Sequence, residues 1–440
     1  MFSFFLLIFP SISLNPIILV PPMYGSKLFA TYNKDKGDTG LLWYCPRKMD
    51  DELFWVKPSL AIPPMINCLI QLLEMHIDPI TKKIVSRNNT TISTHDFGGD
   101  TSVDYVDAGI FGFHFIETFD TFFSYLKGRG YTVHKDLFAA PYDWRCGVIG
   151  LDDFWPNYKS LIENATTFNN RKVTIFAYST GGYLTQLFLS TSPLIDDQWK
   201  RKYIASVIYL APSFGGITIS FASLFRHYNP VLPFIRNTYM TNMLVGLPIL
   251  YNHFPNHIVF NGTKIIFGPD GDSYGPPEMP QLLIDHKKLS GDGFEFLRRS
   301  IEISKKAPRP SGLPTIILYN SKSPTFFYLN FSKGWEQPPI VSYEPGDGTI
   351  PAKGPEWACK NWNNWNDEYF YPGEKKNISQ PIVHCINMNS TKVEFQHVPM
   401  ASNKYIHQLA YNFTNYQEWT EFKEDKPEEE WKNIYQRTWI

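Results

Sequence analysis

A short segment around Ser179 has the residue types that a nucleophilic serine requires. Residues 177–181 read Ala-Tyr-Ser-Thr-Gly, which fits the pattern G-x-S-x-G with alanine at the first position. Small residues two positions before and after the serine let a strand and a helix approach closely, so that the hydroxyl projects from a tight turn. The pattern predicts a serine that attacks a carbonyl carbon and forms an acyl intermediate.

A serine hydroxyl needs a base to remove its proton, and in sites of this kind the chain order is serine, acid, histidine. His397 lies two residues after the last predicted strand, in the loop before the last predicted helix, so it is the expected base. His384 and His407 are the weaker alternatives.

The expected acid is Asp347, which stands between two glycines in a predicted turn. It would orient the imidazole and stabilise its charged form without taking the proton. Asp367 and Glu344 are weaker candidates.

Two backbone amides are expected to stabilise the oxyanion that forms during acyl transfer. One is the amide of Thr180, at the start of the predicted helix. The other should follow the first core strand. Because Pro21 and Pro22 have no N–H group, Met23 has the first available amide there.

The elements that must position these groups alternate between strands and helices. Apolar runs of strand length occupy residues 15–20, 172–177, 204–210 and 313–318, and residues 392–395 are a last, short strand candidate. Apolar residues recur at helical spacing after Ser179 and again over 406–413. This alternation predicts an α/β fold with a parallel sheet and helices on both faces.

Three further segments interrupt or follow this pattern. Residues 45–75 form an apolar and aromatic insertion, and residues 216–310 form a larger one that would cap the sheet. Residues 416–440 are charged and predict a C-terminal appendage. The chain is therefore expected to be one catalytic domain, residues 14–440, with two insertions.

The composition favours a globular protein and argues against nucleic-acid binding. Hydrophobic residues make up 43% of the chain, and 41 basic residues face 42 acidic ones, which leaves no basic surplus for a phosphate backbone. Aromatic residues make up 16%, which fits either a protein that handles interfacial material or a large aromatic core.

Several features indicate passage through the secretory pathway. Residues 1–13 combine a short apolar run with Ser11 and Ser13 and predict a signal peptide, although a basic start is missing. No later run is long enough to predict a membrane-spanning helix. Eight glycosylation sequons agree with this route: Asn88, Asn89, Asn164, Asn261, Asn330, Asn377, Asn389 and Asn412.

Four of the five cysteines fall as two local pairs, Cys45 with Cys68 and Cys359 with Cys385. In an oxidising compartment each pair could close a loop, which would leave Cys146 as a buried thiol. No cysteine or histidine spacing suggests zinc, and the Asp270-Gly-Asp-Ser turn has Tyr274 where a calcium ligand belongs. We expect neither a metal nor a cofactor.

Four motifs together resemble the lecithin:cholesterol acyltransferase and lysosomal phospholipase A family, over about residues 14–415. They are Ile-Ile-Leu-Val-Pro at 17–21 with Gly-Ser-Lys-Leu at 25–28, Ala-Pro-Tyr-Asp-Trp-Arg at 140–145, the serine turn with Leu-Ala-Pro-Ser-Phe-Gly-Gly at 210–216, and Gly-Asp-Gly-Thr-Ile at 346–350 with His397, Met400 and Asn403. The six-residue string at 140–145 is the most specific, and within it Asp143 and Arg145 are expected to form a buried structural pair.

The resemblance implies an α/β-hydrolase fold with a cap and a small membrane-binding subdomain. It implies cleavage of a phospholipid acyl ester and transfer of the acyl group to water or to a lipid hydroxyl (a sterol, ceramide or diacylglycerol), in a secreted or lysosomal protein. Ser179, Asp347 and His397 would be the catalytic residues, with the amides of Met23 and Thr180 as oxyanion donors. The alternative is a non-catalytic lipid-binding protein that retains the fold.

The resemblance also implies a disulfide between Cys45 and Cys68 in a loop that contacts a membrane or lipoprotein surface. Leu53, Phe54 and Trp55 match the apolar tip of that loop, although core packing is the competing interpretation for Trp55.

The sequence departs from the family pattern at three places. Tyr178 replaces a histidine before the serine, and Pro22 replaces a glycine in the oxyanion loop. The family's second disulfide uses an upstream cysteine, where only Cys146 is left, so we expect Cys359 to pair with Cys385 and keep Cys146 as the alternative partner.

Overall fold

The computed structural model of the chain describes residues 14–107, 109, 114, 116–226, 241–371 and 382–415. The predicted signal peptide (1–13) and C-terminal appendage (416–440) lie outside the described residues, as does the sequon at Asn377.

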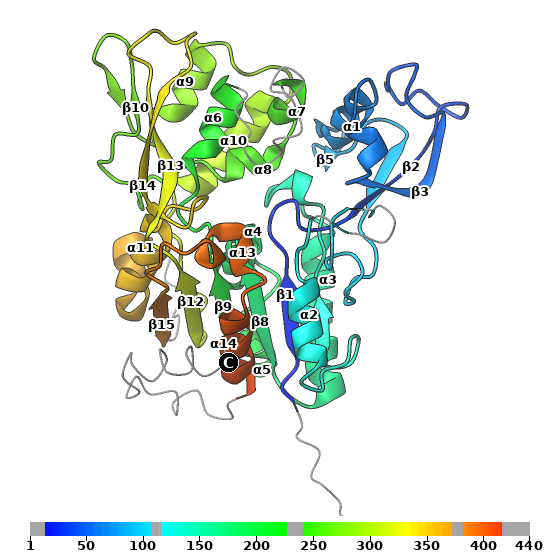
Figure 1. Ribbon diagram of the computed structural model, residues 1–440, viewed down its shortest axis with the longest axis vertical. Coiled ribbons are helices and arrows are strands. Elements are labelled where there is room, and N and C mark those ends of the chain that lie inside the picture. Colours follow the sequence, from blue (N-terminus) through cyan, green and yellow to red (C-terminus); the bar gives the residue numbers. More distant parts are fainter. Residues whose placement is uncertain are drawn as a thin grey trace, which may run out of the picture.

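A six-stranded parallel sheet forms the centre of the molecule (Figure 1). In spatial order its strands are β15 (Val383–Asn387), β12 (Thr315–Tyr319), β9 (Ile204–Leu210), β8 (Val173–Tyr178), β1 (Ile17–Val20) and β7 (Leu137–Ala139). Every neighbouring pair is parallel, so all six carboxyl ends lie at one edge of the sheet. The first strand of the chain is thus an inner strand, next to β8.

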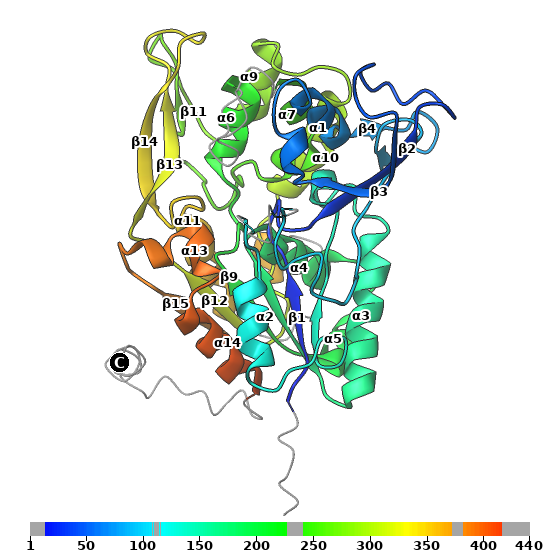
Figure 2. The same ribbon diagram turned by 45° about the vertical axis from the view of Figure 1, so that its right-hand side comes forward.

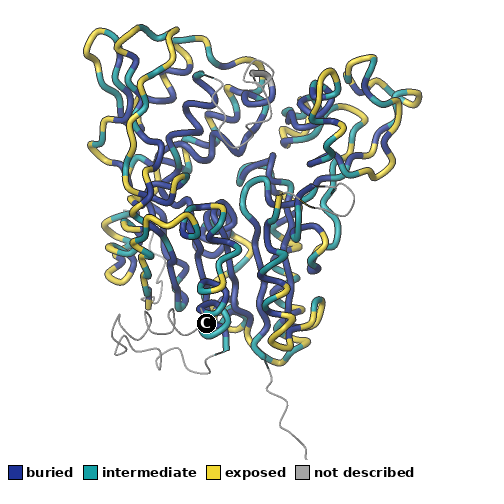
Figure 3. The backbone as a smooth tube through the Cα atoms, in the orientation of Figure 1, coloured by how far each residue is buried: buried dark blue, intermediate teal, exposed yellow. Residues whose placement is uncertain are grey.

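Helices cover both faces because the strands are apolar on both sides. Ile18, Ile175 and Val207 belong to one buried cluster, which includes residues of α3 (Phe154–Asn169) and α4 (Thr180–Thr191). The alternate residues, such as Phe176 and Ile208, belong to a second cluster with α2 (Asp120–Lys127) and α14 (Lys404–Asn415). Figure 3 shows these strands as buried. The predicted α/β fold is confirmed.

The sequence located the inner strands but not the edges of the sheet. The runs at 15–20, 172–177, 204–210 and 313–318 correspond to β1, β8, β9 and β12 within about two residues. The predicted strand at 392–395 is wrong: Val393–Phe395 is a 3₁₀ helix, and the last strand is β15. The edge strand β15 reads Val-His-Cys-Ile-Asn, in which only Val383 is buried and His384 and Asn387 interrupt the apolar residues, so it gives no continuous apolar signal.

Two groups of elements lie beyond the carboxyl ends of the strands (Figures 1 and 2). The smaller group follows β1 in the chain. It contains a three-stranded antiparallel sheet, a short hairpin and one helix: β2 (Leu28–Asn33), β3 (Lys48–Trp55), β6 (Thr90–Ser93), β4 (His76–Ile77), β5 (Ile84–Val85) and α1 (Ile66–Leu73).

The larger group lies mainly between β9 and β12. Its helices are α6 (Thr218–Arg226), α7 (Thr241–Val245), α8 (Pro248–Asn252), α9 (Met279–Asp285) and α10 (Gly293–Ser304). A four-stranded sheet flanks them, built from β11 (Ser273–Tyr274), β10 (Ile266–Phe267), β13 (Ser323–Asn330) and β14 (Ile340–Gly346). Four more short helices belong to the described structure: α5 (Asp197–Tyr203), α11 (Lys353–Asn361), α12 (Asp367–Phe370) and α13 (His397–Met400).

Two disulfides cross-link the structure. Cys45 bonds to Cys68 on α1, and Cys359 on α11 bonds to Cys385 on β15. Cys146 is a buried free thiol, and burial raises its pKa well above the usual range. Among the residues that the structure describes, no helix has both the length and the apolar character needed to cross a bilayer.

Candidate active site

Ser179 lies on the sharp turn between β8 and α4, at the carboxyl edge of the sheet. Its backbone has φ 55° and ψ −119°, a conformation that L-residues rarely adopt. The turn also packs against the end of β1: a Cβ at Gly181 would lie 2.4 Å from the carbonyl oxygen of Pro21 and 2.5 Å from that of Val20. Only glycine fits there. The serine turn and the end of β1 therefore approach each other as closely as the sequence pattern requires.

Three side chains from distant parts of the chain form a row of hydrogen bonds at this turn. Nε2 of His397 lies 2.9 Å from Oγ of Ser179, and its Nδ1 lies 2.7 Å from Oδ2 of Asp347. A carboxylate only accepts, so Nδ1 carries the proton and Nε2 is left with a lone pair facing the serine hydroxyl. All three side chains are buried, with Asp347 2% exposed.

The turn after β14 fixes the Asp347 carboxylate. Its second oxygen, Oδ1, accepts from the backbone N–H of Thr349 (2.9 Å) and of Ile350 (2.7 Å). The carbonyl oxygen of Asp347 also accepts from the N–H of His397 at 2.8 Å. Acid and base are therefore joined both through their side chains and through the backbone.

Tyr178, noted in the sequence only as a departure from the family, contacts the same histidine. Its hydroxyl donates to the carbonyl oxygen of His397 at 2.7 Å, and the two ring centroids are 5.3 Å apart. Tyr178 is buried at the end of β8. The residue before the serine thus holds the start of α13, which carries the imidazole.

The two residues expected to supply oxyanion amides follow two neighbouring parallel strands, Met23 after β1 and Thr180 after β8. Thr180 is the first residue of α4, where the backbone N–H has no acceptor within the helix. Met23 lies in the tight turn that follows β1, which the N–H of Gly25 closes by donating to the carbonyl oxygen of Pro22 at 3.0 Å.

The weaker sequence candidates have other neighbours. His384 lies within β15, where it faces Ile316 in the parallel register. His407 is buried on α14 and stacks on Phe122. Asp367 accepts from the buried Arg309, and Glu344 accepts from the hydroxyl of Tyr328.

The expected apolar membrane tip at Leu53, Phe54 and Trp55 is wrong. Phe54 and Trp55 are 0% and 1% exposed, and Leu53 is partly buried. The end of β3 is turned inward: the indole N–H of Trp55 donates to the carbonyl oxygen of Tyr24 at 3.1 Å, and its ring packs edge-on against Trp144. The sequence could not separate this core role from a surface one.

The strongly exposed apolar residues in and next to this insertion are others. Trp43 is 88% exposed and Ile62 is 61% exposed. Trp43 stands two residues before Cys45, and Ile62 four residues before α1, which holds Cys68.

Arg145 connects the same insertion to the sheet. It is fully buried and donates to both oxygens of Asp143, to the carbonyl oxygen of Leu72 at 2.6 Å and to Oγ of Ser86 at 2.9 Å. The pair expected from the Ala-Pro-Tyr-Asp-Trp-Arg string is therefore present, and each guanidinium nitrogen has at least one partner that offsets the cost of burial.

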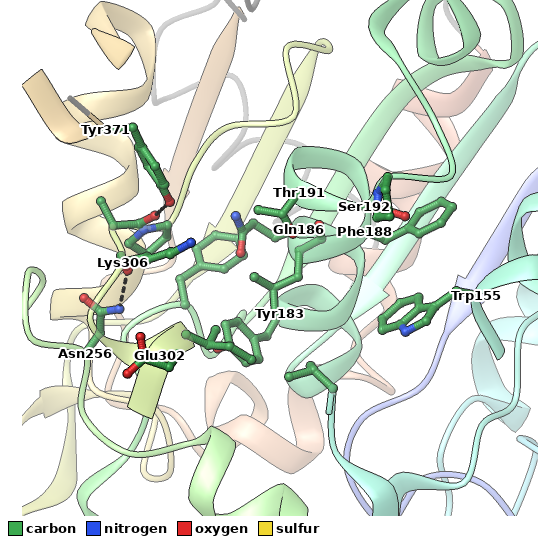
Figure 4. Close-up of a pocket in the computed structure, with 17 residues that line it drawn as sticks. Trp155, Tyr183, Gln186, Phe188, Thr191, Ser192, Asn256, Glu302, Lys306 and Tyr371 are labelled. Carbon is green, nitrogen blue, oxygen red and sulfur yellow. Dashed lines mark hydrogen bonds between the residues drawn. The ribbon is translucent and has the colours of Figure 1, made fainter. Parts of the chain in front are cut away.

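A pocket of about 360 Å³ lies on the outer side of α4 (Figure 4). Tyr183, Gln186 and Phe188 of α4 form one wall, and Lys306 and Tyr371 lie opposite. Its lining includes none of Ser179, Asp347 and His397. The pocket is thus distinct from the row of hydrogen bonds at the serine turn.

Comparison with known proteins gives one consistent group of relatives. Residues 51–269 match the family model described as lecithin:cholesterol acyltransferase. The human lysosomal phospholipase A and acyltransferase is 26% identical over 366 residues, which cover 79% of this chain and 82% of that protein. The chicken phosphatidylcholine-sterol acyltransferase is 25% identical over 388 residues, covering 87% and 90%. Among solved structures, the Tle4–Tli4 complex matches with a TM-score of 0.47 and 11% identity, over 92% of this chain and 99% of that one.

Proposed function

We propose that the chain is a member of the lecithin:cholesterol acyltransferase family, and that it cleaves a phospholipid acyl ester through an acyl-serine intermediate and passes the acyl group to water or to a lipid hydroxyl. The observation that carries this proposal is the row of hydrogen bonds from Asp347 through His397 to Ser179. A non-catalytic lipid-binding protein would have no need for this arrangement.

In the first half of the proposed reaction, Nε2 of His397 takes the proton of Ser179 while Oγ attacks the ester carbonyl carbon. Asp347 stabilises the imidazolium that results. The amides of Thr180 and Met23 donate to the tetrahedral oxyanion. The ester C–O bond then breaks, and His397 returns the proton to the departing lysophospholipid oxygen.

In the second half, His397 removes a proton from the acceptor, whose oxygen attacks the acyl carbon. The bond to Oγ breaks and Ser179 regains its proton. Water gives a free fatty acid, whereas the hydroxyl of a sterol, ceramide or diacylglycerol gives a new ester. Phospholipase activity and acyl transfer both occur in the names of the relatives, which supports proposing both outcomes.

We also propose that the protein works at a membrane or lipoprotein surface and is secreted or lysosomal. Two disulfides fit an oxidising compartment. In place of the buried Trp55, we assign the lipid contact to Trp43 and Ile62, large apolar side chains that remain exposed beside the Cys45–Cys68 disulfide.

Labelling with a fluorophosphonate probe tests the nucleophile. The wild-type protein should be labelled and Ser179→Ala should not; labelling that survives the substitution would exclude Ser179. Phosphatidylcholine vesicles with and without a sterol or ceramide then separate fatty-acid release from formation of a new ester. If neither product forms while soluble esters are cleaved, the proposed lipid substrate is wrong.

Vesicle sedimentation tests the surface contact. The double variant Trp43→Ala with Ile62→Ala should bind phosphatidylcholine vesicles more weakly and cleave a soluble ester at the wild-type rate. Ile80→Ala is the control, because Ile80 is also 88% exposed but lies on the turn between β4 and β5. Equal loss in the control would contradict the assignment to Trp43 and Ile62.

A further inference from the structure

His253 is a buried histidine that the proposed reaction does not use. It directly follows α8, in the insertion between β9 and β12, and it is 2% exposed. We propose that its imidazole is a positioning residue for the oxyanion side of the active site, because it accepts a hydrogen bond from the hydroxyl of Thr180 and so fixes the first residue of α4. This inference rests on the proposed function.

The contacts of the imidazole determine which nitrogen carries the proton. Nδ1 lies 2.9 Å from the carbonyl oxygen of Ile249, which can only accept, so Nδ1 is the protonated nitrogen. Nε2 then has a lone pair and lies 3.1 Å from Oγ1 of Thr180 and 3.1 Å from Oγ of Ser213. The hydroxyls of Thr180 and Ser213 are therefore the donors, and they share this single lone pair.

Burial keeps the imidazole of His253 uncharged. Desolvation lowers the pKa of His253 to about 4, so the ring keeps its Nε2 lone pair at neutral and mildly acidic pH. The ring of Tyr183, one turn along α4, packs edge-on against it at 5.7 Å.

The backbone around His253 is equally constrained. Its carbonyl oxygen accepts from the N–H of Ile217 at 2.7 Å. Gly216 has φ 75°, and a Cβ there would lie 2.7 Å from the same oxygen and 2.3 Å from that of Phe254. The histidine therefore joins three parts of the chain: the end of α8, the segment after β9 and the serine turn.

The kinetic consequence follows from when the oxyanion forms. The Thr180 amide meets a full negative charge only in the transition state, so a displaced amide lowers kcat and leaves KM nearly unchanged. Complete loss of one oxyanion donor costs on the order of 10²–10³ in kcat, and misplacement without loss should cost less, about tenfold.

The test compares His253→Leu, Thr180→Val and the double variant in steady-state cleavage of a soluble p-nitrophenyl ester. Each single variant should lower kcat about tenfold at similar KM, and the double variant should be no slower than the slower single one, because both remove the same hydrogen bond. His253→Gln, whose carbonyl oxygen can accept in place of Nε2, should recover most of the rate.

Thr185→Val is the matched control. It removes another buried threonine hydroxyl of α4, whose partner is the hydroxyl of Tyr158 at 3.3 Å, and it should leave kcat unchanged. The inference is overturned if kcat of His253→Leu equals that of the wild type, if the losses in the two single variants multiply, or if His253→Gln is no faster than His253→Leu.

Fluorophosphonate labelling of every variant separates this inference from the proposed function. If the wild-type protein and Ser179→Ala are labelled alike, the proposed function fails. If only Ser179 is labelled and the His253 variants keep the wild-type kcat, the proposed function stands and the positioning role fails.

Discussion

Acidification should destabilise this protein through a histidine that has no part in the proposed reaction. His407 is fully buried on α14, where its ring stacks on Phe122 with centroids 4.5 Å apart and Nε2 lies 2.7 Å from the carbonyl oxygen of Ala401. Desolvation lowers its pKa from 6.5 to about 4. A solvated histidine in the unfolded chain therefore binds a proton between these two pH values, whereas the folded one does not.

The sign and size of the effect follow from this difference. The unfolded state binds more protons between about pH 6.5 and 4, so the free energy of unfolding falls as the pH falls through that window. One such histidine changes it by about 2 kcal/mol between pH 7 and 4.5. His253, whose pKa burial also lowers to about 4, adds a change of the same sign.

Urea denaturation of the wild type and of His407→Phe at several pH values between 7 and 4.5 measures the effect. The variant loses the hydrogen bond to Ala401, so its stability at pH 7 should be lower, but its decline with acid should be smaller by about 2 kcal/mol. Phe413→Leu, on the same helix, should lower stability by about 1 kcal/mol at every pH without changing the decline. If His407→Phe declines as steeply as the wild type, the reasoning is refuted.

Three other outcomes are expected. Tyr178→Phe removes the hydrogen bond to the carbonyl of His397; kcat on a soluble ester should fall severalfold and calorimetry should show a Tm lower by about 1 °C, and an unchanged kcat would show that this bond does not position the base. Replacing Cys359 and Cys385 by alanine should lower the free energy of unfolding by about 3 kcal/mol in urea titrations, and no loss would contradict a stapling role. Trp55→Ala should cost about 3–5 kcal/mol because the ring is in the core, whereas a surface role predicts less than about 0.5 kcal/mol.

The fold was predictable where burial is complete on both sides of a strand. The runs that became β1, β8, β9 and β12 are continuously apolar because helices cover both faces, and this pattern is visible in the sequence alone. The edge strands are short or alternate with polar residues, so β7 and β15 give little signal. The alternating segment Lys-Val-Glu-Phe at 392–395 has the period of a strand but forms a 3₁₀ helix over Val393–Phe395.

The candidate site also has a part that the sequence predicts and a part that it does not. Ser179, Asp347 and His397 stand in segments with recognisable local patterns, and the structure brings them within hydrogen-bonding distance. The contacts of Tyr178 and His253 are made across the fold and depend on tertiary packing, which no local pattern encodes. The prediction that Trp55 is exposed is wrong for the same reason, because a tryptophan in an apolar loop has the same sequence pattern whether it is buried or exposed.

The order of the three side chains along the chain has a consequence for the newly made protein. Ser179 and His397 are 218 residues apart, and the last 50 of those separate His397 from Asp347. At ribosomal speeds of about 5–20 residues per second, the serine is synthesised roughly 10–45 s before its base. A nascent or truncated chain thus carries a nucleophile without a proton acceptor. Under the proposed reaction, we therefore expect no ester cleavage until the C-terminal segment has folded into place.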